Sequence, residues 1–264
     1  MYATNYHRAS SVEDAARLLG SAEDGKYVAG GQTLIATMKQ RLASPSDLID
    51  LRHVDGMKGI VVDGGTVRIG AAVTHAEVAS SAAIKAVCPA ISALAGMIGD
   101  PHVRHMGTIG GSIANNDPAA DYPAAMLALA ATIITDRRQV PADDFFAGLF
   151  ETALEDGELI TAISFAAPQT AGYAKFPNPA SRYAMAGVFV AKGSGGVRVA
   201  VTGAGASGVF RHTAMEAALA ANWSAEALAN VAVAEDGLMS DMHCSSQYRA
   251  NLVKVMAKRA VLAA

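Results

Sequence analysis

Apolar positions in the first fifty residues switch between helical and strand spacing, and polar or glycine residues mark each switch. Val12, Ala15, Ala16 and Leu19 recur at helical spacing. The preceding segment Ser10-Ser11-Val12-Glu13 resembles a capping box, which starts a helix. The pattern therefore predicts a helix here, a short buried strand over residues 27–29, a second helix over 34–40 and a strand over 48–51.

A different pattern begins near Gly56. Strand-like residues 60–62 and 66–69 flank Asp63-Gly64-Gly65, which is a strong hairpin signal. Thr74-His75-Ala76-Glu77 has the spacing of a second capping box. The pattern then predicts a buried helix over 84–98, interrupted by Pro89, and a further helix over 118–131.

The segment 166–172 separates this region from a third one. Residues 186–191 and 197–202 have strand character, with a glycine-rich turn over 193–196 between them. The remaining residues predict helices over 214–221, 225–232 and 246–262. We therefore expect three parts, covering residues 1–55, 56–167 and 172–264.

Composition excludes several classes of protein. The chain has 264 residues, 52% of them hydrophobic, and a net charge of −3, which gives no basis for binding nucleic acid or a membrane surface. The apolar stretch 124–134 is much too short to span a membrane. Residues 1–8 lack the apolar core of a signal peptide, so we expect a cytoplasmic protein.

Cysteine and histidine usage argues against a metal site in this chain. Cys88 and Cys244 are isolated, and the seven histidines form no ligand motif. An all-cysteine iron–sulfur cluster needs about four thiolates, which this chain does not have.

Two glycine-rich loops carry the main functional signal. They are Ala29-Gly30-Gly31-Gln32-Thr33 and Thr108-Ile109-Gly110-Gly111-Ser112, and each lies between an apolar segment and a predicted helix. Glycine lets a ligand approach the backbone closely, and a helix start adds free N–H groups and a positive dipole end. Either glycine pair alone is more typical of a tight turn. Together, they predict a diphosphate held by backbone N–H groups from two sides.

A third glycine cluster, Gly203-Ala204-Gly205-Ala206-Ser207-Gly208, matches the spacing of a dinucleotide-binding fingerprint. That fingerprint also needs a strand–helix–strand unit and an acidic residue after the second strand. Glu235 is the available acid, but the residues after it look helical and leave no room for a continuing sheet. We therefore interpret this cluster as a glycine-rich bend after a strand.

Several segments, in this order, resemble one known family. They are Ala29 to Leu34, Ile69-Gly70-Ala71-Ala72-Val73-Thr74, Ile98 to Arg104 continuing into Gly107 to Asn115, and Asp117-Pro118-Ala119-Ala120-Asp121. The chain resembles, over essentially its whole length, the FAD-binding medium subunits of molybdenum hydroxylases, the carbon monoxide dehydrogenase and xanthine dehydrogenase family.

The resemblance implies an α+β fold of the vanillyl-alcohol-oxidase type (PCMH-type). This fold has an FAD-binding domain of two subdomains, here 1–55 and 56–167. A small C-terminal domain of antiparallel sheet plus helices follows, here 172–264. His102 and His105 depart from the glutamine and asparagine common in the family at these positions, which could alter the polarity around a flavin.

The resemblance also implies which residues contact the cofactor. Without it, Asp121 would be an acid at a helix start, Ile160 a core residue and Lys175 a solvated charge. Tyr183 matches the position that covers the flavin ring, and its alternative is a half-buried strand residue. The implied FAD-binding residues are Tyr27, Val28, Ala29, Gly30, Gly31, Gln32, Thr33, Leu34, Ile98, Thr108, Ile109, Gly110, Gly111, Ser112, Asp121, Ile160, Lys175 and Tyr183.

By the same resemblance, the chain is an oxidoreductase subunit that transfers electrons. A large partner subunit would carry the molybdenum cofactor and a small one two 2Fe-2S clusters, in a dimer of heterotrimers, that is, a heterohexamer. FAD would collect electrons from the clusters and pass them to an external acceptor. Two alternatives stay open: a self-sufficient flavin oxidase of the same fold, and a flavin-free assembly module, which the intact glycine loops disfavour.

Overall fold

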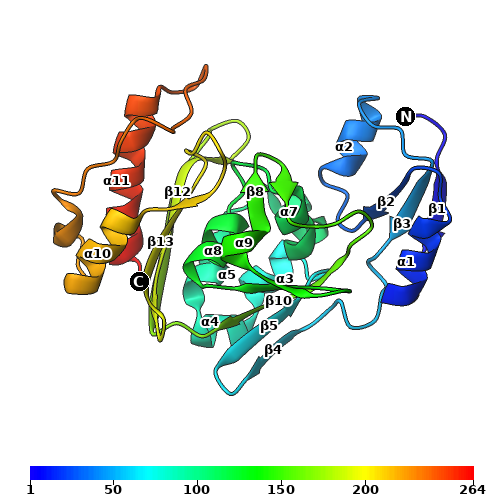
Figure 1. Cartoon of the computed structure of the whole chain (residues 1–264), viewed down its shortest axis with the longest axis horizontal. Coiled ribbons are helices and arrows are strands. Elements are labelled where there is room, and N and C mark those ends of the chain that lie inside the picture. Colours follow the sequence, from blue (N-terminus) through cyan, green and yellow to red (C-terminus); the bar gives the residue numbers. More distant parts are fainter.

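The computed structural model describes all residues, 1–264, and contains three main sheets (Figure 1). The first has three parallel strands in the order β1-β3-β2, the second five antiparallel strands in the order β4-β5-β10-β6-β7, and the third four antiparallel strands in the order β11-β12-β13-β14. The mixture of helices with largely antiparallel sheets confirms the α+β class.

The N-terminal part forms the parallel sheet and two short helices. The predicted helix over 34–40 and strand over 48–51 are confirmed within one residue. The first strand was missed because Asn5-Tyr6-His7-Arg8 is mostly exposed and has no apolar alternation. The elements are β1 (Asn5–Arg8), α1 (Val12–Gly20), β2 (Gly25–Val28), α2 (Leu34–Lys39) and β3 (Asp47–Asp50).

The capping prediction for the first helix is wrong by one position. Ser11, not Ser10, is the N-cap, and its side chain accepts a hydrogen bond from the N–H of Asp14. The Asp14 carboxylate in turn accepts from the N–H of Ser10 at 3.0 Å. Asp14 thus takes the place expected for Glu13, and the helix still begins at Val12.

The second part starts with the predicted hairpin, in which Gly64 and Gly65 adopt positive φ angles of 54° and 79°. The predicted capping box is confirmed, because Thr74 accepts from Glu77 N while Glu77 accepts from Thr74 N. Its elements are β4 (Ile60–Asp63), β5 (Thr66–Gly70), α3 (His75–Ser80), α4 (Ala82–Val87), α5 (Pro89–Gly96), α6 (Pro101–Met106), α7 (Ile109–Asn115), α8 (Tyr122–Ala128), β6 (Thr132–Thr135), β7 (Gln139–Pro141), α9 (Ala142–Phe145), β8 (Phe146–Gly148), β9 (Glu151–Thr152) and β10 (Ile160–Ala166).

Two helix predictions in this part need adjustment. Pro89 divides the helix predicted over 84–98 into α4 and α5, as expected. The helix predicted over 118–131 is shorter, because residues 118–121 form a turn and Ala130 has a left-handed φ of 48°. The completely buried α8 therefore starts directly after Asp121.

The C-terminal sheet lies between two pairs of helices (Figure 1). One face packs against α5 and α8, and the other packs against α10 and α11. This placement explains why β12 is buried at eight successive positions and shows no polar alternation. The elements are β11 (Thr170–Pro177), β12 (Ala184–Gly193), β13 (Gly196–Thr202), β14 (Phe210–Arg211), α10 (Thr213–Ala221), η1 (Glu226–Leu228) and α11 (Ser246–Leu262).

Two of the three helices predicted for the C-terminal part form in the structure. The helices over 214–221 and 246–262 are confirmed, but the helix over 225–232 is wrong, since only the single turn η1 forms there. The cluster Gly203–Gly208 is a bend after β13, as interpreted, and Gly203 packs against the backbone of Ala184. The structure contains no helix with the length and apolarity needed to cross a membrane.

Candidate functional site: a cavity between the glycine loops

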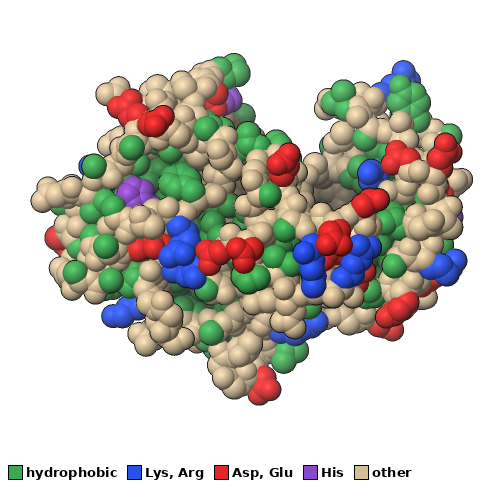
Figure 2. Space-filling view, viewed as in Figure 1, with side chains coloured by type: hydrophobic (Ala, Val, Ile, Leu, Met, Phe, Trp, Pro, Cys, Tyr) green, Lys and Arg blue, Asp and Glu red, His purple; other side chains and the backbone are tan.

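A cavity of about 710 Å³ lies where the N-terminal sheet faces the second part of the chain. In Figure 2 the surface is deeply hollowed between the N-terminal elements on the right and the centre of the molecule. Both glycine-rich loops line this cavity, although 78 positions separate Gly30 from Thr108 (108 − 30).

The two loops touch at Gly30. A Cβ atom there would lie 2.3 Å from the Met106 carbonyl oxygen and 2.6 Å from Gly107 Cα. No side chain fits in this space, so glycine is required by the contact between the loops. Glycine is favoured at position 31 for a different reason: its φ of +68° lies in the left-handed region, which residues with a side chain rarely adopt.

The glycines of the second loop also differ from each other. A Cβ on Gly110 would lie 2.5 Å from the Ala71 side chain and 2.7 Å from the Ala71 carbonyl oxygen. A Cβ on Gly111 would approach only the Thr108 hydroxyl, at 2.9 Å. Both glycines border the cavity, but Gly110 is required by its contact with Ala71, which follows β5, whereas a side chain at Gly111 would meet only Thr108.

Free backbone donors come from the first loop. The N–H groups of residues 30–33 donate no hydrogen bond within the chain. In the second loop, Ile109 N donates to Val73 O at 3.0 Å, Gly110 N to Ala71 O at 2.9 Å and Gly111 N to Thr108 Oγ1 at 3.2 Å. The expectation of free N–H groups from both sides is therefore wrong for residues 109–111. That loop offers the Ser112 hydroxyl and the bare backbone of Gly111 instead.

Asp121 lines the cavity from the end of the turn before α8. It is 4% exposed, accepts a hydrogen bond from the Tyr173 hydroxyl, and lies 3.0 Å from the Lys175 ammonium group. Burial raises the pKa of Asp121 from its ordinary value, while Lys175 and Tyr173 oppose that rise. Lys175 itself does not border the cavity, so it acts on a ligand through Asp121.

Tyr183 stands at the rim, in the turn between β11 and β12 rather than in a strand. It is 46% exposed. The neighbouring Arg182 donates from Nη1 to Gly99 O at 3.3 Å, which joins this turn to the loop that contains Ile98. The aromatic ring is thus held beside the opening of the cavity.

The cavity brings together the predicted residues with two exceptions, Ile109 and Lys175. Ile109 is fully buried in the core because the first turn of α7 directs its side chain away from the cavity. Residues that were not predicted as cofactor contacts also line it, and several of them, such as Ala71, Gly107 and Asn115, lie in the segments that carry the family resemblance. The lining residues that were not predicted are Lys26, Thr37, Leu51, Met57, Ala71, His75, Gly99, Val103, Gly107, Ala114, Asn115, Asp117, Ala120, Leu154, Glu158, Leu159, Ser181 and Arg182.

Two of the missed acids differ in their electrostatics. Glu158 is 5% exposed and accepts two hydrogen bonds from Arg138, at 2.9 and 2.8 Å, which lower the pKa of its carboxyl group to about 2. Its negative charge is therefore neutralised locally. Asp117 has no such cation, and burial raises the pKa of its carboxyl group.

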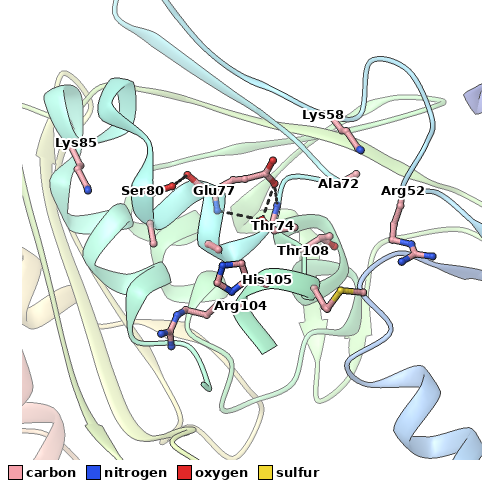
Figure 3. Close-up of a pocket in the computed structure, with 13 residues that line it drawn as sticks. Arg52, Lys58, Ala72, Thr74, Glu77, Ser80, Lys85, Arg104, His105 and Thr108 are labelled. Carbon is pink, nitrogen blue, oxygen red and sulfur yellow. Dashed lines mark hydrogen bonds between the residues drawn. The ribbon is translucent and has the colours of Figure 1, made fainter. Parts of the chain in front are cut away.

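A second hollow of about 750 Å³ lies on the other side of α6 (Figure 3). It shares only Thr108 with the predicted site and contains neither glycine pair. Basic side chains dominate its lining, and Glu77 is occupied in the capping box drawn there. The basic residues are Arg52, Lys58, Lys85, Arg104 and His105. Because its lining contains no run of successive free N–H groups like that of residues 30–33, this hollow is the weaker candidate for a diphosphate.

Comparisons with known proteins identify the family of the chain. Residues 2–168 match the family described as the FAD binding domain in molybdopterin dehydrogenase. The nicotine 6-hydroxylase medium subunit of Paenarthrobacter nicotinovorans is 35% identical over 99% of this chain and 97% of its own length. The carbon monoxide dehydrogenase medium chain of Hydrogenophaga pseudoflava is 34% identical over 98% of this chain and 96% of its own.

Solved structures show the same relationship. A chain of carbon monoxide dehydrogenase from Hydrogenophaga pseudoflava superposes with a TM-score of 0.90 at 36% identity, covering 100% of this chain and 97% of that one. A chain of quinoline 2-oxidoreductase from Pseudomonas putida 86 gives a TM-score of 0.88 at 26% identity, with 99% and 96% covered. The chain therefore belongs to the family of FAD-binding domains of molybdopterin dehydrogenases. It is a flavoprotein part of an oxidoreductase, and its cofactor is FAD.

Proposed function

We propose that this chain is the electron-transfer subunit of a heteromeric molybdenum hydroxylase. It accepts electrons from 2Fe-2S clusters on a partner subunit and passes them, through FAD, to an external acceptor. The relatives that match along nearly their whole length are medium subunits or medium chains, which supports a multi-subunit enzyme. The FAD itself supplies the redox chemistry, since a flavin exchanges electrons and the protein tunes and orients it.

The observation that carries the proposal is the run of free N–H groups over residues 30–33 at the cavity wall. Successive N–H groups of this kind form a concave anion site that suits a diphosphate. The opposing loop closes the site with Gly111 and Ser112 and leaves no side chain in the way. Tyr183 would then stack on the flavin ring at the rim and exclude water.

We further propose that the PCMH-type division into two FAD-binding subdomains and a C-terminal domain applies here. The cavity lies between the parallel sheet and the five-stranded sheet, which supports FAD bridging residues 1–55 and 56–167. Residues 172–264 contribute the rim, through Ser181, Arg182 and Tyr183, and one buried cation, Lys175.

The proposal of partner subunits rests on the side chains that could hold an iron–sulfur cluster. Cys88 and Cys244 are both buried, and no group of three or more His, Cys, Asp or Glu residues gathers in the fold. A 2Fe-2S cluster therefore needs another polypeptide. We propose a small subunit with two such clusters and a large subunit with the molybdenum cofactor, assembled as a dimer of heterotrimers.

The test is purification of the full chain, alone and by an affinity tag from the cells that naturally produce it. The proposal expects oxidised-flavin absorption bands and co-purification of iron, molybdenum and two further subunits, with a mass equal to two heterotrimers. Flavin without any partner would instead indicate a self-sufficient oxidase. Absence of flavin even in a purified complex would overturn the FAD role in this chain.

A further inference from the structure

One buried imidazole beside the cavity has no hydrogen-bond partner. His75 is the first residue of α3, and its backbone N–H donates to Gly107 O at 2.9 Å. The side chain is 5% exposed and borders the cavity. Nδ1 is completely enclosed without a partner, and Nε2 makes no hydrogen bond within the chain either. Buried polar atoms of this kind are rare in folded proteins.

The surroundings of His75 define which edge of the ring faces outward. One side contacts the ring of Tyr122, whose centroid is 5.4 Å away and whose hydroxyl also lacks a partner. The opposite edge points at Gly107, where a Cβ would lie 2.7 Å from Nε2 and 2.9 Å from Cδ2. Because residue 107 has no side chain, space remains beside Nε2, and Nε2 is not among the fully enclosed unpartnered atoms, whereas Nδ1 is.

The protonation state follows from burial and charge. Burial, together with a smaller contribution from the nearby Arg104 guanidinium, lowers the pKa of His75 to about 4. No carboxylate contacts the imidazole; Asp121 is adjacent in sequence to Tyr122 but bonds to Tyr173 and Lys175. A neutral imidazole has one N–H, and an unpaired buried N–H is rarer than an unpaired acceptor. The proton therefore belongs on Nε2 rather than on the enclosed Nδ1.

We propose that His75 is a further FAD-binding residue, whose Nε2–H donates a hydrogen bond to an oxygen of the cofactor where FAD passes the segment Gly107–Thr108. This inference rests on the proposed FAD role of the cavity. It assigns the imidazole a ligand partner in place of one within the chain. His75 thus adds a side-chain donor on the side where the N–H groups of residues 109–111 are already bonded within the chain.

A binding role and a structural role for His75 predict different effects when the residue is replaced. A residue kept for the stability of the fold would destabilise the chain when replaced. An imidazole whose partner is a ligand has an unpaired buried nitrogen in the ligand-free chain, which lowers stability. An apolar replacement of similar size should therefore leave the free energy of unfolding unchanged or raise it. The cost then appears only in the affinity for FAD.

The experiment uses the full chain, stripped of flavin, and three variants: His75→Leu, His75→Gln and His105→Leu. His105 is a matched control, because it lies on α6 close by but does not border the cavity. FAD affinity is measured by fluorescence titration, and stability by urea unfolding without FAD. One lost hydrogen bond predicts about tenfold weaker FAD binding for His75→Leu. His75→Gln, which keeps a donor, should recover most of the affinity, and His105→Leu should match the wild type.

A second measurement observes the imidazole of the wild-type chain directly. In ¹⁵N-histidine-labelled wild-type chain, the ring nitrogen shifts of His75 report which nitrogen carries the proton, with His75→Gln used only for assignment. We expect the Nε2–H form without FAD and a shift of Nε2, not Nδ1, on FAD addition. Unchanged affinity in His75→Leu, or an Nδ1–H form, would overturn the role of His75 while FAD binding by the wild type stands. Failure of the wild type to bind FAD would instead reject the proposed function.

Discussion

The ammonium group of Lys175 lies 3.0 Å from Asp121 Oδ1, and the two side chains are only 3% and 4% exposed. The pair joins the C-terminal sheet to the turn that precedes α8, across 54 positions of sequence. Asp121 reaches the cavity and Lys175 stands behind it. The lysine therefore allows a carboxylate to be buried next to the cofactor site.

Replacing Lys175 with methionine should destabilise the chain by about 3–5 kcal/mol, because it leaves the buried Asp121 carboxylate without a cation. Urea unfolding of the FAD-free chain measures this change. Lys192→Met, at an exposed position of β12 in the same sheet, is the control and should change stability by less than about 0.5 kcal/mol. Equal effects of the two substitutions would contradict a structural role for the buried pair.

Gly111→Ala should weaken FAD binding by about tenfold or more and leave the fold intact. The added methyl group meets only the Thr108 hydroxyl and otherwise projects into the cavity. Gly110→Ala should instead destabilise the FAD-free chain by about 1–3 kcal/mol, since the methyl group meets the Ala71 backbone. Paired FAD titration and urea unfolding distinguish the two, and a Gly111 variant that binds FAD normally would show that this residue faces no ligand.

The ion pair of Arg138 and Glu158 predicts a specific acid sensitivity. Hydrogen bonds from Arg138 lower the pKa of Glu158 in the folded chain to about 2, against an ordinary value of 4.5. The stability from this pair is therefore fully present above pH 4.5 and is lost as the pH falls towards 2. Arg138→Gln should cost about 1.5–3 kcal/mol at pH 7, and the difference from wild type should shrink below pH 4.5.

Stability is read from urea unfolding at several pH values, and Arg137→Gln serves as the control. Arg137 is half-exposed, its ion pairs are longer, at 3.6 and 3.7 Å, and its side chain donates one exposed hydrogen bond, to Asp156 O at 3.1 Å. Its replacement should have little effect at any pH. A constant difference between wild type and Arg138→Gln from pH 7 to pH 3 would contradict the assignment.

Asn116 ends α7 in a left-handed conformation, with φ 42° and ψ 49°. Its side-chain amide donates to Gly148 O at 2.9 Å and to Glu151 O at 2.8 Å, which fixes the β8–β9 hairpin. Asn116→Gly keeps the backbone conformation but loses both hydrogen bonds, and should cost about 1–3 kcal/mol. Asn116→Ala adds left-handed strain of about 1 kcal/mol. Similar unfolding free energies for these two variants would show that the conformation contributes no strain.

The sequence predicts the glycine loops and their chemistry because the glycines, the helix start and the apolar segments are adjacent in the chain. It does not predict which glycine has which task. That division depends on Met106 and Ala71, which become neighbours of Gly30 and Gly110 only in the folded chain. The same limit applies to the donors, since the N–H groups of Ile109 and Gly110 are taken by Val73 and Ala71.

The sequence also does not predict which polar residues are buried, because burial depends on the tertiary fold. The charge of Lys175 looks solvated in the sequence until its sheet places it beside Asp121. His75 is part of a recognisable capping box, but nothing nearby in sequence indicates that its ring borders the cavity. The helix predicted over 225–232 is wrong although the local sequence favours it. Its alanine-rich composition is typical of a helix, but the chain there forms only the turn η1.

The N-terminal sheet has a small separate core of Val28, Met38 and Leu48, while its Ile49 belongs to the main core. Across the junction with the second part, the Tyr27 hydroxyl donates to Gly157 O at 3.3 Å. A ligand held on both sides of this junction stabilises the closed arrangement by mass action. FAD supply would then set the lifetime of the chain in the cell. In a flavin-starved cell, this region would open more often and expose the polypeptide to proteolysis.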